Sequence, residues 1–316
     1  MTPRTRAGLV KFLPVESGAR VALVAPASPF DPAAFEAGLA ELKRIGLEPV
    51  FDARVFASHP IVAGPVETRV SIMAEALARP DVRAVIAIRG GYGSAEMLPH
   101  LDAAALRRAR KAVIGYSDVT SLHAFLNGHV RVASVHGAMV DGRLSKGADG
   151  YDVATFLNSL TCTPIGEQSP EGVEVIRRGE AVGPIFGGTL TQIAASLGTP
   201  YEFLAPPRHV LFLEDVAERP YRIRRLLTQL RQSGRLAAAS AVIFGQMVRC
   251  DEPGGGITAR DVVSEFFADF PGPVVFGFPS GHTTTPSLSF PLGVETRVVA
   301  TDTDSARVIF TEAAAE

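Results

Sequence analysis

Cysteine and net charge are both scarce in this sequence of 316 residues. The two cysteines, Cys162 and Cys250, lie far apart and belong to no Cys-x-x-Cys or Cys/His cluster. This spacing excludes the common zinc sites and a disulfide framework, so we expect two reduced, buried thiols. The formal net charge of -2 gives no electrostatic reason to expect a nucleic acid or an acidic membrane as a partner.

Long apolar runs are also missing. No stretch approaches the ~20 apolar residues of a membrane-spanning helix. Near the start, Pro14, Glu16 and Arg20 interrupt the sequence, where a secretory signal needs about 7–15 apolar residues. We therefore expect a cytoplasmic protein that does not enter a membrane. A hydrophobic content of 47% with 20% charged residues is typical of a globular enzyme with one large or two ordinary domains.

Short apolar runs alternate with amphipathic segments in the first half of the chain. Buried strands are predicted at residues 20–25, 48–51, 83–88 and 111–114. Helices are predicted after Asp31, a good N-cap, up to Gly46 as the C′ residue, and again over 66–78. Strands that alternate with helices of this length indicate an α/β fold with a parallel sheet covered on both faces.

The second half predicts another α/β or α+β unit. Its predicted strands are 173–176, 210–213, 241–244, 274–276, 297–299 and 307–310. Its predicted helices are 191–197, 221–233 and 259–267. Glycine, proline and serine cluster between 142 and 179, which indicates the connection between two domains. We expect an N-terminal nucleophile domain at 1–145, a linker region at 146–180 and a C-terminal domain at 181–316.

Ser117 is the first candidate for chemistry. It follows the strand at 111–114 through Gly115 and Tyr116, and a helix-like segment begins directly after it. Ligands bind beyond the carboxyl ends of parallel strands, and such a turn exposes Oγ beside the N–H groups of a helix start. The pattern is G-x-S-D, with Val119 where α/β-hydrolases carry a second glycine. A helix N-cap is therefore the alternative for this serine.

The glycine-rich loop RGGYGS, Arg89–Ser94, also follows a predicted strand. Its glycines let the backbone approach a ligand and aim N–H groups at an anion. A dinucleotide site does not fit, because Glu96 stands where the third glycine of G-x-G-x-x-G belongs. A plain glycine turn remains open, and an oxyanion loop that faces Ser117 is the functional interpretation.

Glu214 and His282 follow predicted strands of the second half. Glu214 is costly to bury at a strand end unless it is hydrogen-bonded, so it either caps a helix or orients a histidine, and Asp215 is expected to point to the opposite side. His282 lies in a polar loop, with His136 as its nearest competitor for a site role. The order Ser, Glu, His, with the serine in the first domain and its partners in the second, predicts a site in an interdomain cleft. Surface or structural roles are expected for His59, His100, His123, His129 and His209.

Over nearly its whole length the chain resembles the LD-carboxypeptidases, the murein tetrapeptide carboxypeptidases of serine-peptidase family S66. The resemblance rests on VALVAPASP, RGGYGSAEMLPHLD, IGYSD, VHG, RRGEAVGPIFGGTLTQIAASLGTPYE, LFLEDVAERPYRIRRLLTQLRQSG and PSGHTTTP. It implies a flavodoxin-like N-terminal domain, a smaller β-containing C-terminal domain, a homodimer, and no metal or cofactor. The implied activity is hydrolysis of the L,D-amide that releases terminal D-alanine from a cytosolic murein tetrapeptide during peptidoglycan recycling.

The resemblance also implies the site residues. The Ser-His-Glu triad falls on Ser117, His282 and Glu214, and the oxyanion hole on main-chain N–H groups of the loop at Gly90 and Gly91 and of Asp118. Arg89 is a candidate for binding the free carboxylate of the substrate; Arg222 is another, for which we expect a structural ion pair instead. The family often has GGN or GGC where this chain has Gly187-Gly188-Thr189. Because threonine can still donate and accept a hydrogen bond, we expect Thr189 to take part in substrate binding.

Two other functions remain open. Relatives in the same family cleave a peptidyl-nucleotide, microcin C-like antibiotic and use an aromatic side chain to stack its base. The chain has no tryptophan, which favours the murein peptide, but Phe or Tyr stack as well. The alternative outside enzymes is a two-domain protein that binds a small ligand, which would not need a serine, a histidine and a glutamate together.

Overall fold

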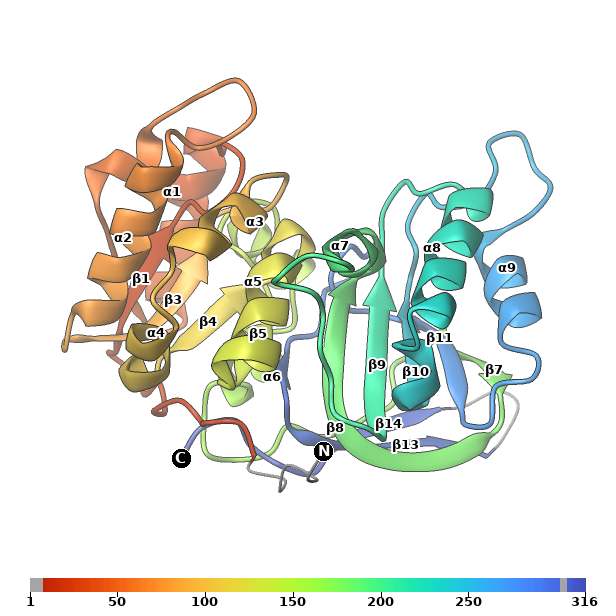
Figure 1. Cartoon of the computed structure of the whole chain (residues 1–316). Coiled ribbons are helices and arrows are strands. Elements are labelled where there is room, and N and C mark those ends of the chain that lie inside the picture. Colours follow the sequence, from red (N-terminus) through yellow and green to blue (C-terminus); the bar gives the residue numbers. More distant parts are fainter. Residues whose placement is uncertain (1–7, 302–305) are drawn as a thin grey trace.

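The computed structural model describes residues 8–301 and 306–316 and contains two β-sheets that lie side by side (Figure 1). The first sheet has the order β12-β5-β4-β3-β1-β2, and the second β6-β14-β13-β8-β9-β10-β11-β7. In the described part of the chain, no helix is both long and apolar enough to cross a membrane. The predicted α/β fold class with a parallel first sheet and a β-containing second half is confirmed.

Five parallel strands and one antiparallel strand make the first sheet. They are β1 (Arg20–Val24), β2 (Glu48–Phe51), β3 (Val82–Ala87), β4 (Ala112–Gly115), β5 (Ser134–His136) and, antiparallel to β5, β12 (Phe290–Leu292). The associated helices are α1 (Pro32–Arg44), α2 (Val66–Ala78), α3 (Ser94–Met97), α4 (Ala103–Ala109), α5 (Thr120–Ala124) and α6 (Val153–Asn158). Asp31 caps α1 by accepting the Ala34 N–H, as its sequence position predicted.

The second sheet is mixed. Its strands are β6 (Gly166–Gln168), β7 (Glu174–Arg177), β8 (Gly179–Thr189), β9 (His209–Glu214), β10 (Ala239–Gly245), β11 (Val274–Phe278), β13 (Glu295–Ala300) and β14 (Arg307–Phe310). Its helices are α7 (Leu190–Ser196), α8 (Pro220–Gln232) and α9 (Ala259–Phe266). Short 3-10 turns lie at 53–56, 98–100, 117–119, 144–149 and 236–238, and a π-helical stretch at 125–130.

The long strand β8 joins the two halves of this sheet. Its residues 179–184 pair antiparallel with β13, whereas residues 185–189 pair parallel with β9. Gly187 has a φ of 143°, and a Cβ at this position would collide with the carbonyl oxygen of Phe212. Only glycine therefore lets β8 lie this close to β9, and the strand then ends with Thr189 opposite Glu214.

Chain segments from both halves of the sequence mix in the two sheets. Strand β12 at 290–292 returns to the first sheet, and β6 from the expected linker region pairs with β14 in the second. The domain boundaries drawn from the sequence stay a prediction. One correction concerns the cysteines: Cys250 is buried as expected, but Cys162 is exposed, because it follows α6 in a surface turn.

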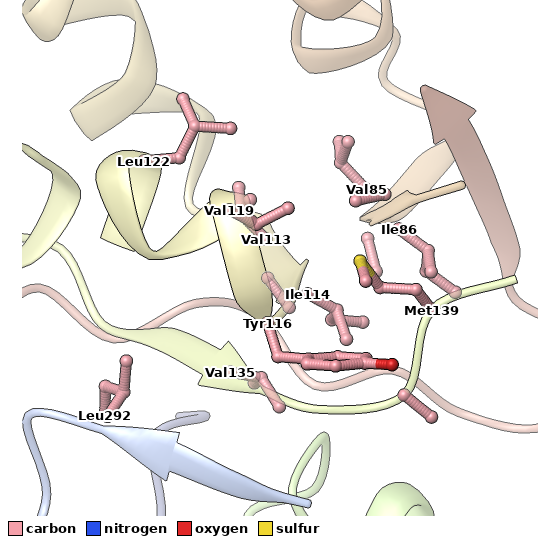
Figure 2. Packing of buried hydrophobic residues seen from close by; sticks show 14 of the residues in the cluster. Val85, Ile86, Val113, Ile114, Tyr116, Val119, Leu122, Val135, Met139 and Leu292 are labelled. Carbon is pink, nitrogen blue, oxygen red and sulfur yellow. The ribbon is translucent and has the colours of Figure 1, made fainter. Parts of the chain in front are cut away.

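The core of the first sheet lies directly under the Ser117 turn. Figure 2 shows Val113, Ile114 and Tyr116 packed among apolar side chains from neighbouring segments, including Val135 and Met139. All five side chains are buried. Burial of this apolar surface holds the end of β4 in place, so the residues that follow it start from a rigid support.

Candidate active site

Ser117 is the first residue of a 3-10 helix, Ser117–Val119, which follows β4 through a sharp turn. Its φ is +62°, the left-handed region that residues other than glycine rarely adopt. Backbone strain of this kind at a strand-to-helix turn is the geometry that presents a nucleophile above the edge of a sheet. The turn expected from the sequence is therefore present, and its backbone is strained at the candidate serine.

The glycine loop packs against this serine. A Cβ on Gly90 would lie 2.9 Å from the Ser117 Cβ and 3.0 Å from its Oγ, so only a residue without a side chain fits. Gly91 has a φ of +103°, and a Cβ at this position would collide with the Ser28 hydroxyl oxygen. The structure thus brings the RGGYGS loop into contact with Ser117.

Glu214 and His282 form a direct pair. Glu214 ends β9 with its side chain fully buried, and its Oε2 lies 2.7 Å from Nδ1 of His282. The same oxygen accepts the backbone N–H of His282 at 2.9 Å. A carboxylate accepts hydrogen bonds only, so Nδ1 carries the proton and Nε2 is the nitrogen left to act as a base.

The protonation states of this pair follow from burial and charge. Burial acts to raise the pKa of Glu214, but the charge and hydrogen bond of His282 outweigh it and hold the pKa well below its usual range. For His282, burial acts to lower the pKa, and the Glu214 carboxylate overcomes this and raises it. Glu214 therefore stays ionised near neutral pH and stabilises a proton on the imidazole.

The Thr189 side chain serves this carboxylate. Its hydroxyl donates a short hydrogen bond to Glu214 Oε1, and the side chain is buried. Its backbone N–H donates to the Thr120 hydroxyl at 3.0 Å. The hydroxyl thus points at the acid that orients His282, and the substrate-binding role expected for Thr189 stays a prediction.

Asp215 and Arg222 have structural partners. Asp215 accepts hydrogen bonds from the backbone N–H and the hydroxyl of Thr191, at 2.9 and 2.7 Å, at the start of α7. It thus points away from its neighbour Glu214, as strand alternation predicted. Arg222 forms a 2.6 Å ion pair with Glu218. Arg89 donates to the carbonyl of Pro29 at 2.8 Å and lies 3.9 Å from Asp141, with a half-exposed side chain.

His136, the competing histidine, is buried among apolar side chains. Its ring packs on Phe212 and Phe290, and burial lowers its pKa to about 3. Ser280 Oγ donates to the carbonyl of Leu288 and so accepts from Nδ1 of His136 at 3.1 Å. This histidine stays neutral and supports the loop that carries His282.

Tyr116 connects the Ser117 turn to His282. The His282 ring contacts the ring of Tyr116, the residue before the serine, with centroids 5.1 Å apart. Within residues 8–301 and 306–316, no hydrogen bond joins Ser117 Oγ to the imidazole. Hydrogen bonds of catalytic groups are often long before substrate binds, and they tighten in the complex.

Arg143 is a site residue that the sequence did not reveal. Its guanidinium donates to the carbonyls of Gly281 and Thr283, at 2.8 and 3.1 Å, on both sides of His282. It also lies 5.9 Å from the centre of the Tyr116 ring. These contacts join the His282 loop to the residue before Ser117. An arginine in a glycine-rich stretch carries no pattern that indicates such long-range contacts.

The described residues contain no group of three or more His, Cys, Asp or Glu side chains placed to hold a metal ion. At the end of the first sheet they contain a strained serine with a glycine loop packed against it. At the ends of strands of the second sheet they contain a histidine that is hydrogen-bonded to a buried carboxylate. This arrangement is typical of serine hydrolases.

Comparison with known proteins shows the family to which the chain belongs. Residues 21–137 match the model of the LD-carboxypeptidase N-terminal domain, and residues 182–298 that of the LD-carboxypeptidase C-terminal domain. The chain is 31% identical over 270 residues to the murein tetrapeptide carboxypeptidase of Pseudomonas aeruginosa, covering 83% of this chain and 88% of that one. The chain belongs to the LD-carboxypeptidase family, as its sequence motifs implied.

Solved structures agree with this fold. The muramoyltetrapeptide carboxypeptidase of Oxalobacter formigenes superposes with a TM-score of 0.82 at 28% identity, covering 93% of this chain and 99% of the other. The microcin C7 self-immunity protein, bound to aspartyl sulfamoyl adenosine, shares the fold with a TM-score of 0.87 at 22% identity, covering 97% and 100% of the two chains. The Escherichia coli form of that protein is 25% identical over 278 residues, 79% of this chain and 80% of its own.

Proposed function

We propose that this chain is a serine carboxypeptidase that hydrolyses the L,D-amide bond of cytoplasmic murein tetrapeptides and releases terminal D-alanine. The observation that carries the proposal is the His282–Glu214 pair at 2.7 Å, beside a strained Ser117 turn. The family relationship and the named activity of the Pseudomonas aeruginosa relative support the substrate class. We also propose that the chain forms a homodimer, as its resemblance to the family implies.

In the proposed mechanism, Ser117 Oγ attacks the scissile carbonyl while Nε2 of His282 takes its proton. Glu214 stays ionised and stabilises the imidazolium that forms. The backbone N–H groups of Gly91 and Asp118 stabilise the oxyanion, and one such donor is typically worth about 3 kcal/mol in the transition state. His282 then protonates the nitrogen of D-alanine as it leaves, and water hydrolyses the acyl-enzyme.

The terminal carboxylate of the substrate needs a cationic or N–H partner, for which we propose Arg89. Its side chain is half exposed and lies in the same loop as Gly90 and Gly91. A guanidinium binds a carboxylate through two parallel hydrogen bonds. Asp141, 3.9 Å from Arg89 Nε, would hold the guanidinium at the loop.

The alternative substrate is a peptidyl-nucleotide, as the likeness to the microcin C7 self-immunity protein suggests. Tyr92 is an exposed residue of the RGGYGS loop and would be available to stack a base. The absence of tryptophan from the chain and the greater identity to the murein tetrapeptide carboxypeptidase favour the murein peptide. A binding protein without catalysis would not need a histidine oriented by a buried carboxylate.

The test is a mass-spectrometric assay of both substrates side by side, a muramoyl tetrapeptide and a peptidyl-adenylate. We expect loss of D-alanine from the tetrapeptide by the wild-type protein and none by Ser117→Ala. Cleavage of the peptidyl-adenylate alone would support the immunity function instead. No cleavage of either substrate would favour the binding protein.

A further inference from the structure

The Asp118 side chain joins the nucleophile turn to the glycine loop. It is 2% exposed, and its Oδ2 accepts the backbone N–H of Ser94 at 2.8 Å. Ser94 also donates its hydroxyl, Oγ, to the backbone carbonyl of Asp118 at 2.5 Å. Asp118 directly follows Ser117, and Ser94 ends the RGGYGS loop. Two hydrogen bonds, both donated by Ser94 and accepted by Asp118, therefore fix the loop end to the residue after the candidate nucleophile.

The second oxygen of the same carboxylate is hydrogen-bonded to α7, a helix of the second sheet. Asp118 Oδ1 accepts Nε2 of Gln192 at 3.2 Å, and Gln192 Oε1 accepts the Ser121 hydroxyl at 3.1 Å. Gln192 belongs to α7, which begins directly after Thr189, the donor to Glu214. Figure 1 shows α5 and α7 side by side where the sheets meet. The Asp118 carboxylate thus connects the Ser117 turn to α7, the helix that begins directly after the Thr189 donor to Glu214.

Other hydrogen bonds fix the glycine loop to the segment that follows β1 and to Arg69 of α2. Arg69, itself buried, donates to the carbonyls of Gly93 and Pro26 at 2.7 and 2.8 Å. Ser28 Oγ accepts the Tyr92 N–H at 3.1 Å. These bonds tie the loop to the residues after β1. The two bonds from Ser94 to Asp118 differ from these anchors because they fix the loop relative to Ser117, and the Asp118 side chain accepts one of them.

We propose that the Asp118 side chain is a positioning residue that acts through Ser94 and Gln192. It keeps the N–H of Gly91 aimed at the oxyanion position and keeps α7, with Thr189, in register with Ser117. The inference rests on the proposed function, because it assumes that Ser117 is the nucleophile. A buried carboxylate is costly and is retained where its hydrogen bonds are needed. A misplacement of about 1 Å in such a site can cost ~100-fold in rate.

The experiment compares Asp118→Ala and Asp118→Asn with the full-length wild-type protein. Two rates are measured: labelling of Ser117 by a fluorophosphonate probe, and D-alanine release with separate kcat and KM. For Asp118→Ala we expect both the labelling rate and kcat to fall by about 100-fold, with KM changed by less than about 3-fold. Asp118→Asn should recover most of the loss, because its oxygen still accepts the Ser94 N–H and a rotated Gln192 amide accepts its NH2.

The control is Asp102→Ala, which removes another aspartate that accepts backbone N–H groups at a helix start, those of Ala104 and Ala105. It should lower the unfolding temperature and leave both rates of the folded protein unchanged. If Asp118→Ala does not fold, two other variants test the network: Ser94→Ala removes the bond to the Asp118 carbonyl, and Gln192→Ala removes the bonds to the Asp118 carboxylate and to Ser121. Each should slow labelling by about 10-fold.

Two results separate this inference from the proposed function. If the wild-type protein is not labelled at Ser117 and releases no D-alanine, the proposed function fails. If the wild-type protein reacts and a folded Asp118→Ala variant labels and turns over within about 3-fold of it, Asp118 is not a positioning residue. The same holds if Ser94→Ala and Gln192→Ala both leave the labelling rate unchanged.

Discussion

Glu214 Oε2 accepts two hydrogen bonds from His282, one from the ring Nδ1 at 2.7 Å and one from the backbone N–H at 2.9 Å. The pair of bonds fixes the position of the residue as well as the tautomer of its ring. A Cβ on Gly281 would lie 2.7 Å from the Glu214 carboxyl carbon, so glycine before the histidine makes this approach possible. Nε2 is then left to face the substrate side, where we propose that it serves Ser117.

The pH dependence of activity should report this pair. A histidine base works when neutral, so kcat/KM should fall as the pH drops through the His282 pKa. Because Glu214 raises that pKa, the acid limb should lie above the ordinary value of about 6.5. In Glu214→Gln, burial lowers the His282 pKa without the charge of Glu214 to oppose it, so the limb should move to lower pH while kcat falls at least about 100-fold. An unshifted limb would contradict the assignment.

Gly90→Ala should displace the nucleophile without unfolding the protein. The added Cβ would meet Ser117 at 2.9–3.0 Å, and Gly90 does not have a positive φ that alanine would strain. We expect kcat to fall about 100-fold at a nearly unchanged unfolding temperature. Gly8→Ala is the matched control, since its Cβ would meet nothing within 4 Å. Full activity of Gly90→Ala would show that the loop does not bear on Ser117.

Thr189→Val removes the hydroxyl that donates to Glu214 and keeps the shape of the side chain. The loss of a hydrogen bond to a charged group is worth about 1.5–3 kcal/mol, so kcat/KM should fall by roughly 10- to 100-fold. The acid limb of the pH profile should shift as well, because the Glu214 carboxylate loses a donor. Thr189→Ser retains the donor and should be close to wild type. Equal activities of Val and Ser variants would place Thr189 outside the site.

Acid should destabilise the protein through its buried histidines. Burial lowers the pKa of His123 and His209 to about 4 and that of His136 to about 3. As the pH falls below about 6.5, the unfolded chain binds protons that the folded protein does not, so stability is present above this pH and lost below it. Each histidine contributes up to about 1.4 kcal/mol per pH unit to the slope.

His209→Gln tests this linkage away from the site. Glutamine can still donate to the carbonyl of Pro206, the partner of His209 Nδ1, and it does not titrate. Urea unfolding at several values between pH 5 and 7 should give a shallower slope of the free energy of unfolding for the variant. Parallel slopes would show that His209 does not contribute to the acid sensitivity.

The sequence predicted most of the elements because their patterns are local. Helix α2 and strand β14 have the predicted bounds, and the Asp31 cap lies where expected. Strand β8 was missed because its sequence GEAVGPIFGGT contains four glycines and a proline and resembles a loop. Its strand conformation depends on pairing with β9 and β13, which are distant in sequence. Tertiary contacts of this kind override local propensity.

The candidate site shows the same division. Ser117 and His282 follow strands and Glu214 ends one, so their positions at sheet edges could be predicted from the order of apolar runs. The contacts of Thr189 with Glu214, of Arg143 with Gly281 and of Asp118 with Ser94 could not. Hydrogen bonds between residues far apart in sequence leave no periodic pattern, and they depend on the tertiary packing of the elements that carry them.

The most direct test of the account is a single-turnover reaction of the wild-type protein with a muramoyl tetrapeptide, followed by mass spectrometry of both peptide and protein. We expect release of D-alanine together with a transient acyl group on Ser117, and neither in Ser117→Ala. D-alanine release by a folded Ser117→Ala variant at near the wild-type rate, or an acyl group on another residue, would contradict the assignment of Ser117 as the nucleophile.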